Sequence, residues 1–280
     1  MSITVNTNMQ ALKVQHNLNG ATTKMNTAME RMSSGYKINK AKDDAAGFAV
    51  AATLGKTISG GKIAKSNVSM GDDLLQTAEG SLNVVKSNLE RIRDLTEQAA
   101  NGTYSKDDLL GISKEVDARL AQIKNIAETT AFNGKKLLKG DLTDGVDLQI
   151  GTEAGQTLNL NSSIFASVDM GATLGNLKNI ITGGVTSDIS NQLTAIDTEI
   201  TGIINRITDI GAASNRLESI GDTLEVQNTN MTSALSTIKD ADIAEESATY
   251  VQQQILQSAS ATLLTQANSA PQIALTLIQG

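Results

Sequence analysis

A seven-residue spacing of apolar residues runs through the second half of this chain, from residue 189 to residue 238. The first position of the repeat is occupied by Ile189, Ile196, Ile203, Ile210, Leu217, Leu224, Met231 and Ile238. The second position, four residues further on, is occupied by Leu193, Ile200, Ile207, Ser214, Gly221, Asn228 and Leu235. A straight α-helix drifts away from such a repeat. The spacing therefore predicts one long helix, over about 188–235, wound around partner helices with a left-handed supercoil. Small or polar residues in the second position allow close approach of a partner or fix its register.

Helical spacing also predicts helices elsewhere in the chain. We expect them over about 5–32, from Asp43-Asp44 to Asn101-Gly102, from Ser105 through Ala127 with Asn133-Gly134 just beyond, and from about 244 onward. The glycine pairs Gly60-Gly61 and Gly183-Gly184 predict flexible breaks. Pro271 is expected to kink or cap the last helix.

Between residues 140 and 165 the apolar spacing changes from helical to alternating. The alternating residues are Val146, Leu148, Ile150, Leu158 and Leu160, with a glycine-flanked turn at 151–155. This pattern predicts a β-hairpin. Residues 166–186 are rich in Gly, Ser and Thr and are expected to form a loop with little structure of its own.

These elements predict a mainly α fold: a long antiparallel helical bundle or coiled coil with a small β-hairpin region. The long helix should return against the two internal helices, which makes the first and last helices neighbours. The chain has no Trp and three Phe, and thin seams between helices need less aromatic bulk than a thick core. The terminal stripes are mostly Ala, Met and Thr, so each buries too little surface to offset the entropy of ordering. We expect both ends to be disordered in the free chain and to order against other copies.

Charge and hydropathy disfavour several classes of partner. The net charge of −7 disfavours nonspecific nucleic-acid binding. No run of about 18 apolar residues is present, so no membrane insertion is expected. The start of the chain lacks the features of a cleaved signal peptide, which leaves retention in the cell or export by another route. Residues 1–44 are net positive and residues 236–280 are net negative, which favours attraction between the two ends.

No pattern in the sequence is typical of an enzyme, a metal site or a cofactor site. His16 is the only histidine and has no catalytic partner nearby in the sequence. Acidic pairs such as Asp107-Asp108 lack the alternation of an EF-hand loop and suit helix starts instead. Neither glycine pair has the setting of a phosphate-binding loop. We therefore predict a non-enzymatic protein without cofactors.

Several long motifs resemble those of bacterial flagellin. They lie at residues 3–8, 31–39 (RMSSGYKIN), 41–47, 89–95 (LERIRDL), 98–102, 130–138, 148–151, 241–246 and 266–268. The resemblance covers nearly the whole chain. It implies a structural subunit that is exported unfolded through the flagellar type III channel and polymerises into the extracellular filament used for motility.

The resemblance also implies a domain organisation and a set of partners. In flagellins the terminal helices form the filament core, D0, here 1–44 and 236–280, and the intervening helices and hairpin form D1, here 45–235. Large outer domains look absent. The implied partners are further copies of the chain, hook-associated and cap proteins, and an export chaperone at the C-terminal helix. The expected D0 assembly seam consists of Leu18, Met25, Met32, Val251, Ile255 and Leu263.

Flagellins are in addition sensed by the Toll-like receptor specific to flagellin, which implies an innate immune partner. The positions that correspond to this contact are Arg91 and Leu95 on the second helix and Glu115 on the third. The same face suits a contact with the adjacent subunit. The alternative is an ordinary pairing of Arg91 with a nearby carboxylate on the helix surface.

Two other functions fit parts of this pattern. A hook–filament junction protein shares the terminal helices and much of D1, but it would not form long filaments. A cytoplasmic signalling coiled coil would be helical from end to end and would lack the hairpin in the middle of the chain.

Overall fold

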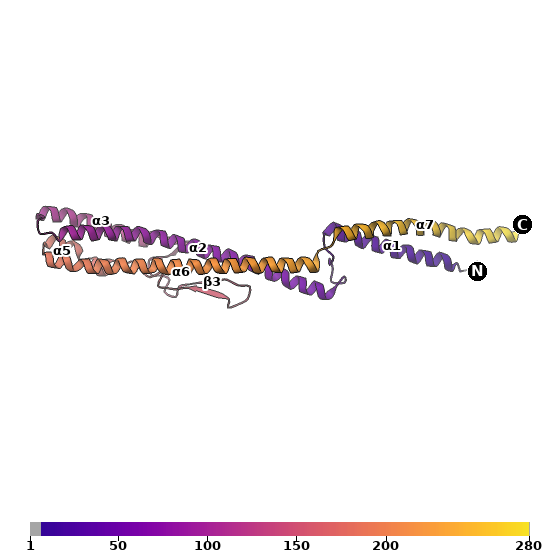
Figure 1. Ribbon diagram of the computed structural model, residues 1–280, viewed down its shortest axis with the longest axis horizontal. Coiled ribbons are helices and arrows are strands. Elements are labelled where there is room, and N and C mark those ends of the chain that lie inside the picture. Colours follow the sequence, from indigo (N-terminus) through magenta and orange to yellow (C-terminus); the bar gives the residue numbers. More distant parts are fainter. Residues whose placement is uncertain (1–6, 280) are drawn as a thin grey trace. The chain divides into compact units, whose positions relative to one another are not determined.

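The computed structural model describes residues 7–279, except for the side chains of residue 172 and of 270–279. Within this range the helices are α1 (Met9–Ser34), α2 (Ala45–Ala99), α3 (Lys106–Thr129), α4 (Gly171–Leu174), α5 (Leu177–Gly183), α6 (Thr186–Lys239) and α7 (Ile243–Gln279) (Figure 1). The strands are β1 (Ala131–Phe132), β2 (Lys135–Lys136), β3 (Val146–Gln149) and β4 (Thr157–Leu160). The predicted mainly α fold is confirmed.

The chain divides into two compact units. Unit 1 contains the residues up to Ile58 and from Thr229 onward, and unit 2 contains Ser59–Asn228. The divisions fall inside the long helices α2 and α6, whereas the expected domain boundaries lie after residues 44 and 235.

The predicted long helix is confirmed as α6, and it supplies one side of the core of unit 2. The first repeat position is buried at Ile189, Ile196, Ile203, Ile210, Leu217 and Leu224. In the second position, Ile200 and Ile207 are partly buried against the same core. The facing side chains of the core include Leu82 and Leu89 from α2 and Val116 from α3. The long helix therefore shares one core with both internal helices, and ion pairs join it directly to α2.

Local capping signals fix several helix ends. Gly35 adopts a left-handed conformation (φ 74°) at the end of α1, and Gly184 does the same (φ 68°) at the end of α5. At the start of α3, Ser105 and Asp108 form a capping box. Hydrogen bonds from the hydroxyl and the N–H of Ser105 lower the pKa of Asp108. These ends follow from the residue types that the sequence places there.

The expected break at Gly60-Gly61 is wrong, because α2 continues through both residues. A side chain at Gly60 would meet Thr152, next to the hairpin, and one at Gly61 would meet Asn228 of α6. A side chain at Gly71 would overlap Leu148 of β3. These glycines allow neighbouring elements to approach α2 closely, which offsets their low helix propensity.

Two glycines of α2 allow a matched test of this explanation. Gly71→Val should lower the free energy of unfolding by about 1–3 kcal/mol, because the added methyl groups overpack the contact with Leu148. Gly80→Ala should raise it by about 0.5–1 kcal/mol, since an added Cβ meets no neighbouring atom within 4 Å and alanine favours the helix. Urea unfolding followed by circular dichroism measures both. A stability gain in Gly71→Val would contradict the packing role.

The predicted hairpin is confirmed, and a smaller one precedes it. Strands β3 and β4 are antiparallel, with Val146 opposite Leu160 and Leu148 opposite Leu158. Leu158 and Leu160 are buried in the core of unit 2. Strands β1 and β2 flank a tight turn at Asn133 (φ 46°) and Gly134 (φ 81°). Asn-Gly is the residue pair that such a turn favours.

The expected loop at 166–186 is also wrong, because this segment contains α4 and α5. Leu174, Leu177 and Ile181 are fully buried in it, next to Phe165. The Arg206 guanidinium of α6 donates hydrogen bonds to the carbonyl oxygens of Ala166 (2.8 Å) and Ser167 (3.2 Å), and burial lowers the pKa of this side chain. The Gly, Ser and Thr content of the segment obscures a short apolar stripe that covers the core.

In unit 1 the first and last helices lie side by side, as expected (Figure 1). Pro271 lies within α7, whose helical backbone continues to Gln279, so the proline does not end the helix. The disorder expected for both ends of the free chain stays a prediction. None of the described helices is both long enough and apolar enough to cross a membrane.

Candidate assembly surfaces

Helix α1 turns its apolar stripe toward α7 in unit 1. Ala21 and Ala28 are buried, and the three seam residues predicted on this helix, Leu18, Met25 and Met32, are half-buried. Met32 lies against α7, because its sulfur accepts a hydrogen bond from the Ser247 hydroxyl. This half of the predicted seam therefore lies along the contact between α1 and α7.

Helix α7 turns a largely polar face toward α1. Gln253 and Ser260 are buried. The Gln257 side chain donates a hydrogen bond to the Thr22 hydroxyl (3.0 Å). Near the other end of the pair, the Asn8 side chain donates to the carbonyl oxygen of Ala267 (2.7 Å). The helix pair thus combines one apolar stripe with one hydrogen-bonding face.

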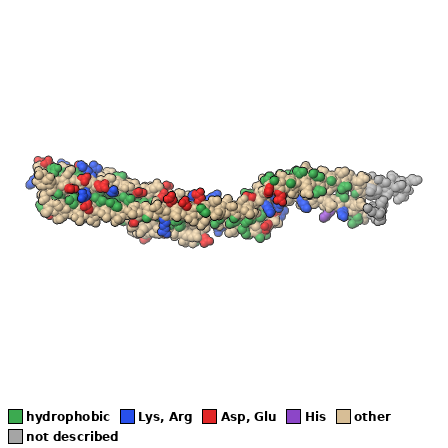
Figure 2. Space-filling model, in the orientation of Figure 1, with side chains coloured by type: hydrophobic (Ala, Val, Ile, Leu, Met, Phe, Trp, Pro, Cys, Tyr) green, Lys and Arg blue, Asp and Glu red, His purple; other side chains and the backbone are tan. Residues whose placement is uncertain are grey.

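The other half of the predicted seam is exposed. Val251 is 51% exposed, Ile255 63% and Leu263 58%, and Leu256 beside them is 46% exposed. Hydrophobic side chains are visible at the surface along this helix pair (Figure 2). The structure therefore does not bring Val251, Ile255 and Leu263 together with Leu18, Met25 and Met32. The four residues Val251, Ile255, Leu256 and Leu263 are called the α7 stripe below.

In unit 1, backbone hydrogen bonds link the connection between α1 and α2 to the connection between α6 and α7. The Lys37 N–H donates to the Lys239 carbonyl (2.7 Å), and the Ala241 N–H donates to the Gly35 carbonyl (2.9 Å). Arg31 pairs with Glu246 at 2.8 Å. The opposite net charges of the two chain ends favour this ion pair.

The predicted contact residues of unit 2 fall into two groups. The Arg91 Nε donates to a carboxylate oxygen of Glu115 at 3.0 Å, and both side chains are substantially exposed. Arg119 lies 3.8 Å from the same carboxylate. Leu95, in contrast, is only 3% exposed and belongs to the core. Its prediction as a surface contact is therefore corrected: in this structure Leu95 packs inside unit 2 and leaves Arg91 and Glu115 as the accessible pair.

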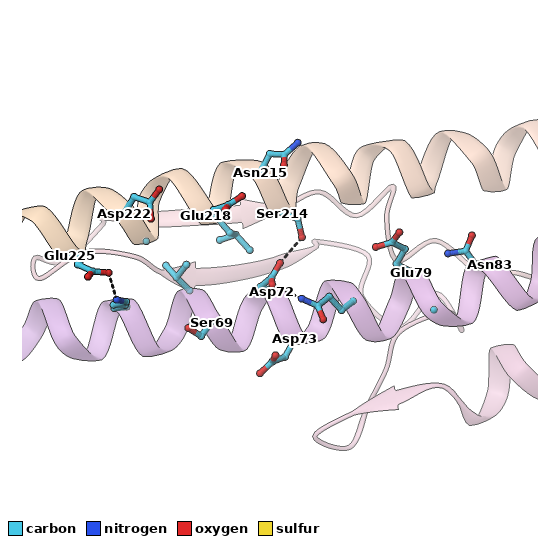
Figure 3. A pocket seen from close by; sticks show the side chains of 16 residues that line it. Ser69, Asp72, Asp73, Glu79, Asn83, Ser214, Asn215, Glu218, Asp222 and Glu225 are labelled. Atoms are coloured by element: carbon cyan, nitrogen blue, oxygen red, sulfur yellow. Dashed lines mark hydrogen bonds and ion pairs between the residues drawn. The ribbon is translucent and has the colours of Figure 1, made fainter.

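One surface feature that the sequence did not predict is a groove between α2 and α6. It lies where the second repeat position is small, at Ser214 and Gly221 (Figure 3). The Ser214 hydroxyl donates to the Asp72 carboxylate at 2.5 Å across the groove. The small residues in the second repeat position are the sequence signal for this groove. They do not show which charged residues surround it. Among the described residues, no group of three or more His, Cys, Asp or Glu is placed to hold a metal.

Comparison with known proteins gives the family of this chain. The bacterial flagellin N-terminal helical region matches residues 5–143, and the bacterial flagellin C-terminal helical region matches residues 193–278. A flagellin of Halalkalibacterium halodurans is 34% identical over 98% of this chain and 99% of its own length. The chain belongs to the bacterial flagellin family. A flagellin of Xenorhabdus nematophila is 35% identical over the full length of both chains.

A solved structure supports the fold assignment. A protein from Vibrio parahaemolyticus described as flagellar hook-associated has a TM-score of 0.63 and 17% identity, over 71% of this chain and 100% of its own. At this identity the similarity concerns the fold alone. The full-length relatives named flagellin favour the filament subunit over the hook–filament junction protein, and the family excludes the signalling coiled coil.

Family membership makes this flagellin a structural subunit of the flagellar filament, located outside the cell, and not an enzyme. The short length agrees with relatives that align with it from end to end. The family does not say which side chains make the contacts between copies.

Proposed function

We propose that this flagellin polymerises through unit 1, with the α7 stripe packed against terminal helices of other copies. The observation that supports this most is the exposure of Val251, Ile255 and Leu263 on one helix. Exposed apolar side chains gathered on one helix are typical of a surface that is covered in an assembly. The contact between α1 and α7 buries Ala21 and Ala28 of α1 but leaves the α7 stripe open.

We assign the terminal helices to the D0 core and the helices and hairpin between them to D1. The polar face of α7 makes the pair of terminal helices a weak one, because buried hydrogen bonds add only about 1 kcal/mol each. Ordering of both ends would then depend on contacts with other copies, which keeps free subunits from polymerising before export. The same exposed α7 stripe suits an export chaperone, and the ends of the filament suit cap and hook-associated proteins.

Electron microscopy of the purified full chain after salting with ammonium sulfate tests the assembly. The expected result is long, uniform tubes, and a variant that lacks residues 236–280 should form none, because it lacks α7. Circular dichroism and gel filtration of the deletion variant check that unit 2 stays folded. Short caps, two-chain rods or monomers from the full chain would contradict the proposed assembly.

A second proposed role is recognition of the free subunit by the flagellin-sensing Toll-like receptor. Its support is the pair Arg91 and Glu115, which joins α2 to α3 at an accessible surface. An exposed arginine held in place by one carboxylate keeps donor groups for a partner, and arginine is frequent among residues that dominate binding energies.

Arg91→Ala should reduce receptor signalling by about 10-fold or more, because loss of such an anchor costs about 2 kcal/mol of binding energy. A dose series on reporter cells measures this effect with purified monomer. Arg93→Ala is the matched control, since Arg93 also joins α2 to a neighbouring carboxylate, Asp197 at 2.6 Å. Equal potency of Arg91→Ala and the unaltered protein, or an equal loss in the control, would contradict a specific role.

A further inference from the structure

The groove between α2 and α6 has an apolar floor and open sides. Its volume is about 970 Å³. Val68 and Leu217 are among the lining residues, and both belong to the buried core. At Gly221 the nearest side chain across the helix pair is Val68, 3.7 Å from the place of an added Cβ. The two small residues Ser214 and Gly221 therefore open a hollow in a helix pair that is otherwise closed by aliphatic side chains.

Acidic side chains surround this hollow. The lining carboxylates are Asp72, Asp73, Glu79, Glu218, Asp222 and Glu225, and Lys65 is the one lysine among the lining residues. Figure 3 shows Asp72 and Glu79 on the side of α2 that faces α6, with Asp73 on its other side, and Glu218, Asp222 and Glu225 along α6. Acidic side chains gather over this part of the surface in Figure 2.

Only some of these carboxylates have a hydrogen-bond donor or an ion-pair partner within unit 2. Asp72 accepts hydrogen bonds from Ser214 and from the Gln76 side chain. Glu225 pairs with Lys65 at 2.6 Å, which lowers the pKa of Glu225. Within the described residues, Asp73, Glu79, Glu218 and Asp222 form no ion pair. The groove therefore keeps an excess of negative charge that a basic partner would neutralise.

A basic segment lies in unit 1, in the connection between α1 and α2. This segment is residues 37–42, which contain Lys37, Lys40 and Lys42 and no acidic residue. Lys40 pairs with Glu30 at 2.5 Å, whereas Lys37 and Lys42 form no ion pair within the described part of the chain. All three lysines are exposed.

The lysine segment is held in one conformation. The Asp43 carboxylate accepts hydrogen bonds from the N–H groups of Lys40 (2.9 Å) and Asn39 (3.2 Å). The Asn39 side chain donates to the Ser34 hydroxyl at 2.8 Å. A preformed segment loses little conformational entropy when it binds, which favours its use as a docking element.

We propose that the acidic groove of unit 2 is the docking site for the lysine segment 37–42 of a second copy of the chain. The proposal rests on the polymerisation proposed above and names one contact of it. An acidic groove repels its own copy, so it cannot form a two-fold contact with itself. A contact between two different surfaces repeats from copy to copy, and it builds an open helical assembly when the rotation between copies does not close into a ring.

A charge-swap experiment on full-length chains tests the pairing. Glu218→Lys with Asp222→Lys should raise the critical concentration for polymerisation about 10-fold, and Lys37→Glu with Lys42→Glu should do the same. The variant with all four changes should return to within about 3-fold of the unaltered chain, because the two charge patterns are exchanged. Glu128→Lys with Asp141→Lys is the control of equal charge change outside the groove and should leave the critical concentration unchanged.

Crosslinking shows whether the contact joins two copies. The chain has no Cys, so Ala41→Cys and Ser69→Cys place one thiol each on the lysine segment and in the groove. Polymers of a mixture of the two single variants should give a crosslinked dimer with a short bismaleimide reagent, and neither variant alone should.

The outcomes separate this inference from the proposed polymerisation. If the unaltered chain forms no polymer, polymerisation itself fails. If it polymerises but charge reversal in the groove has no effect and the mixture gives no crosslink, the docking site is overturned. A chain that carries both Ala41→Cys and Ser69→Cys is tested alongside the mixture. If only this double variant gives a crosslink, the contact lies within one copy and the docking site is also overturned.

Discussion

Replacing Phe165 by alanine is expected to lower the free energy of unfolding of unit 2 by about 3–5 kcal/mol, the range for a buried aromatic residue. Phe165 is fully buried and lies in the core cluster with Leu174, Leu177 and Ile181. Phe165 directly precedes the segment 166–186, which carries α4 and α5. Truncation therefore leaves a cavity and also loosens the cover of the core.

Urea unfolding of the monomer, followed by circular dichroism, measures this loss. Phe48→Ala is the matched control, because Phe48 is 43% exposed and its removal should change stability by less than about 1 kcal/mol. A loss below about 1 kcal/mol in Phe165→Ala would mean that the segment 166–186 contributes little to the core, as its composition alone predicts.

The second large effect is expected on the α7 stripe. The triple variant Val251→Ser, Ile255→Ser and Leu263→Ser should raise the critical concentration for polymerisation by about 100-fold. Each of these side chains is more than half exposed in the single chain. Covering the exposed part contributes about 1 kcal/mol per residue, and about 1.4 kcal/mol corresponds to a factor of ten.

Sedimentation of polymer at a series of protein concentrations gives the critical concentration. The control variant is Gln252→Ser, Gln254→Ser and Thr262→Ser, which alters exposed polar positions of the same helix. It should polymerise like the unaltered chain. An equal effect of both triple variants would point to lost helix propensity and contradict a seam formed by the α7 stripe.

Much of the fold could be predicted because its signals are local or periodic. The repeat that begins at Ile189 predicts α6, and the alternation around Leu148 and Leu158 predicts the hairpin. Ser105 marks the start of α3 through a hydrogen bond that depends on residues three apart. The segment 166–186 is predicted as a loop because Gly, Ser and Thr interrupt its apolar residues. The burial of those apolar residues depends on a core formed by distant parts of the chain.

The candidate surfaces were predictable in part. Leu18, Met25 and Met32 occupy the helix contact that their spacing predicts, while Val251, Ile255 and Leu263 stay exposed in the single chain. The resemblance to flagellin assigned Arg91 and Glu115 to one contact surface, and the structure joins them in an ion pair. The burial of Leu95 could not be predicted, because it depends on how α2 is rotated against its neighbours.

The sequence by itself determined the long helices, the larger hairpin and the family, since heptad spacing, caps and long motifs act over short distances along the chain. Only the tertiary structure decided that Gly60, Gly61 and Gly71 serve close packing within an unbroken helix. It also decided that carboxylates from α2 and α6 surround one groove. The physical reason is that packing distance and local charge depend on residues about 140 to 150 positions apart in the chain, as with Asp72 and Ser214, and no local pattern records which of them meet.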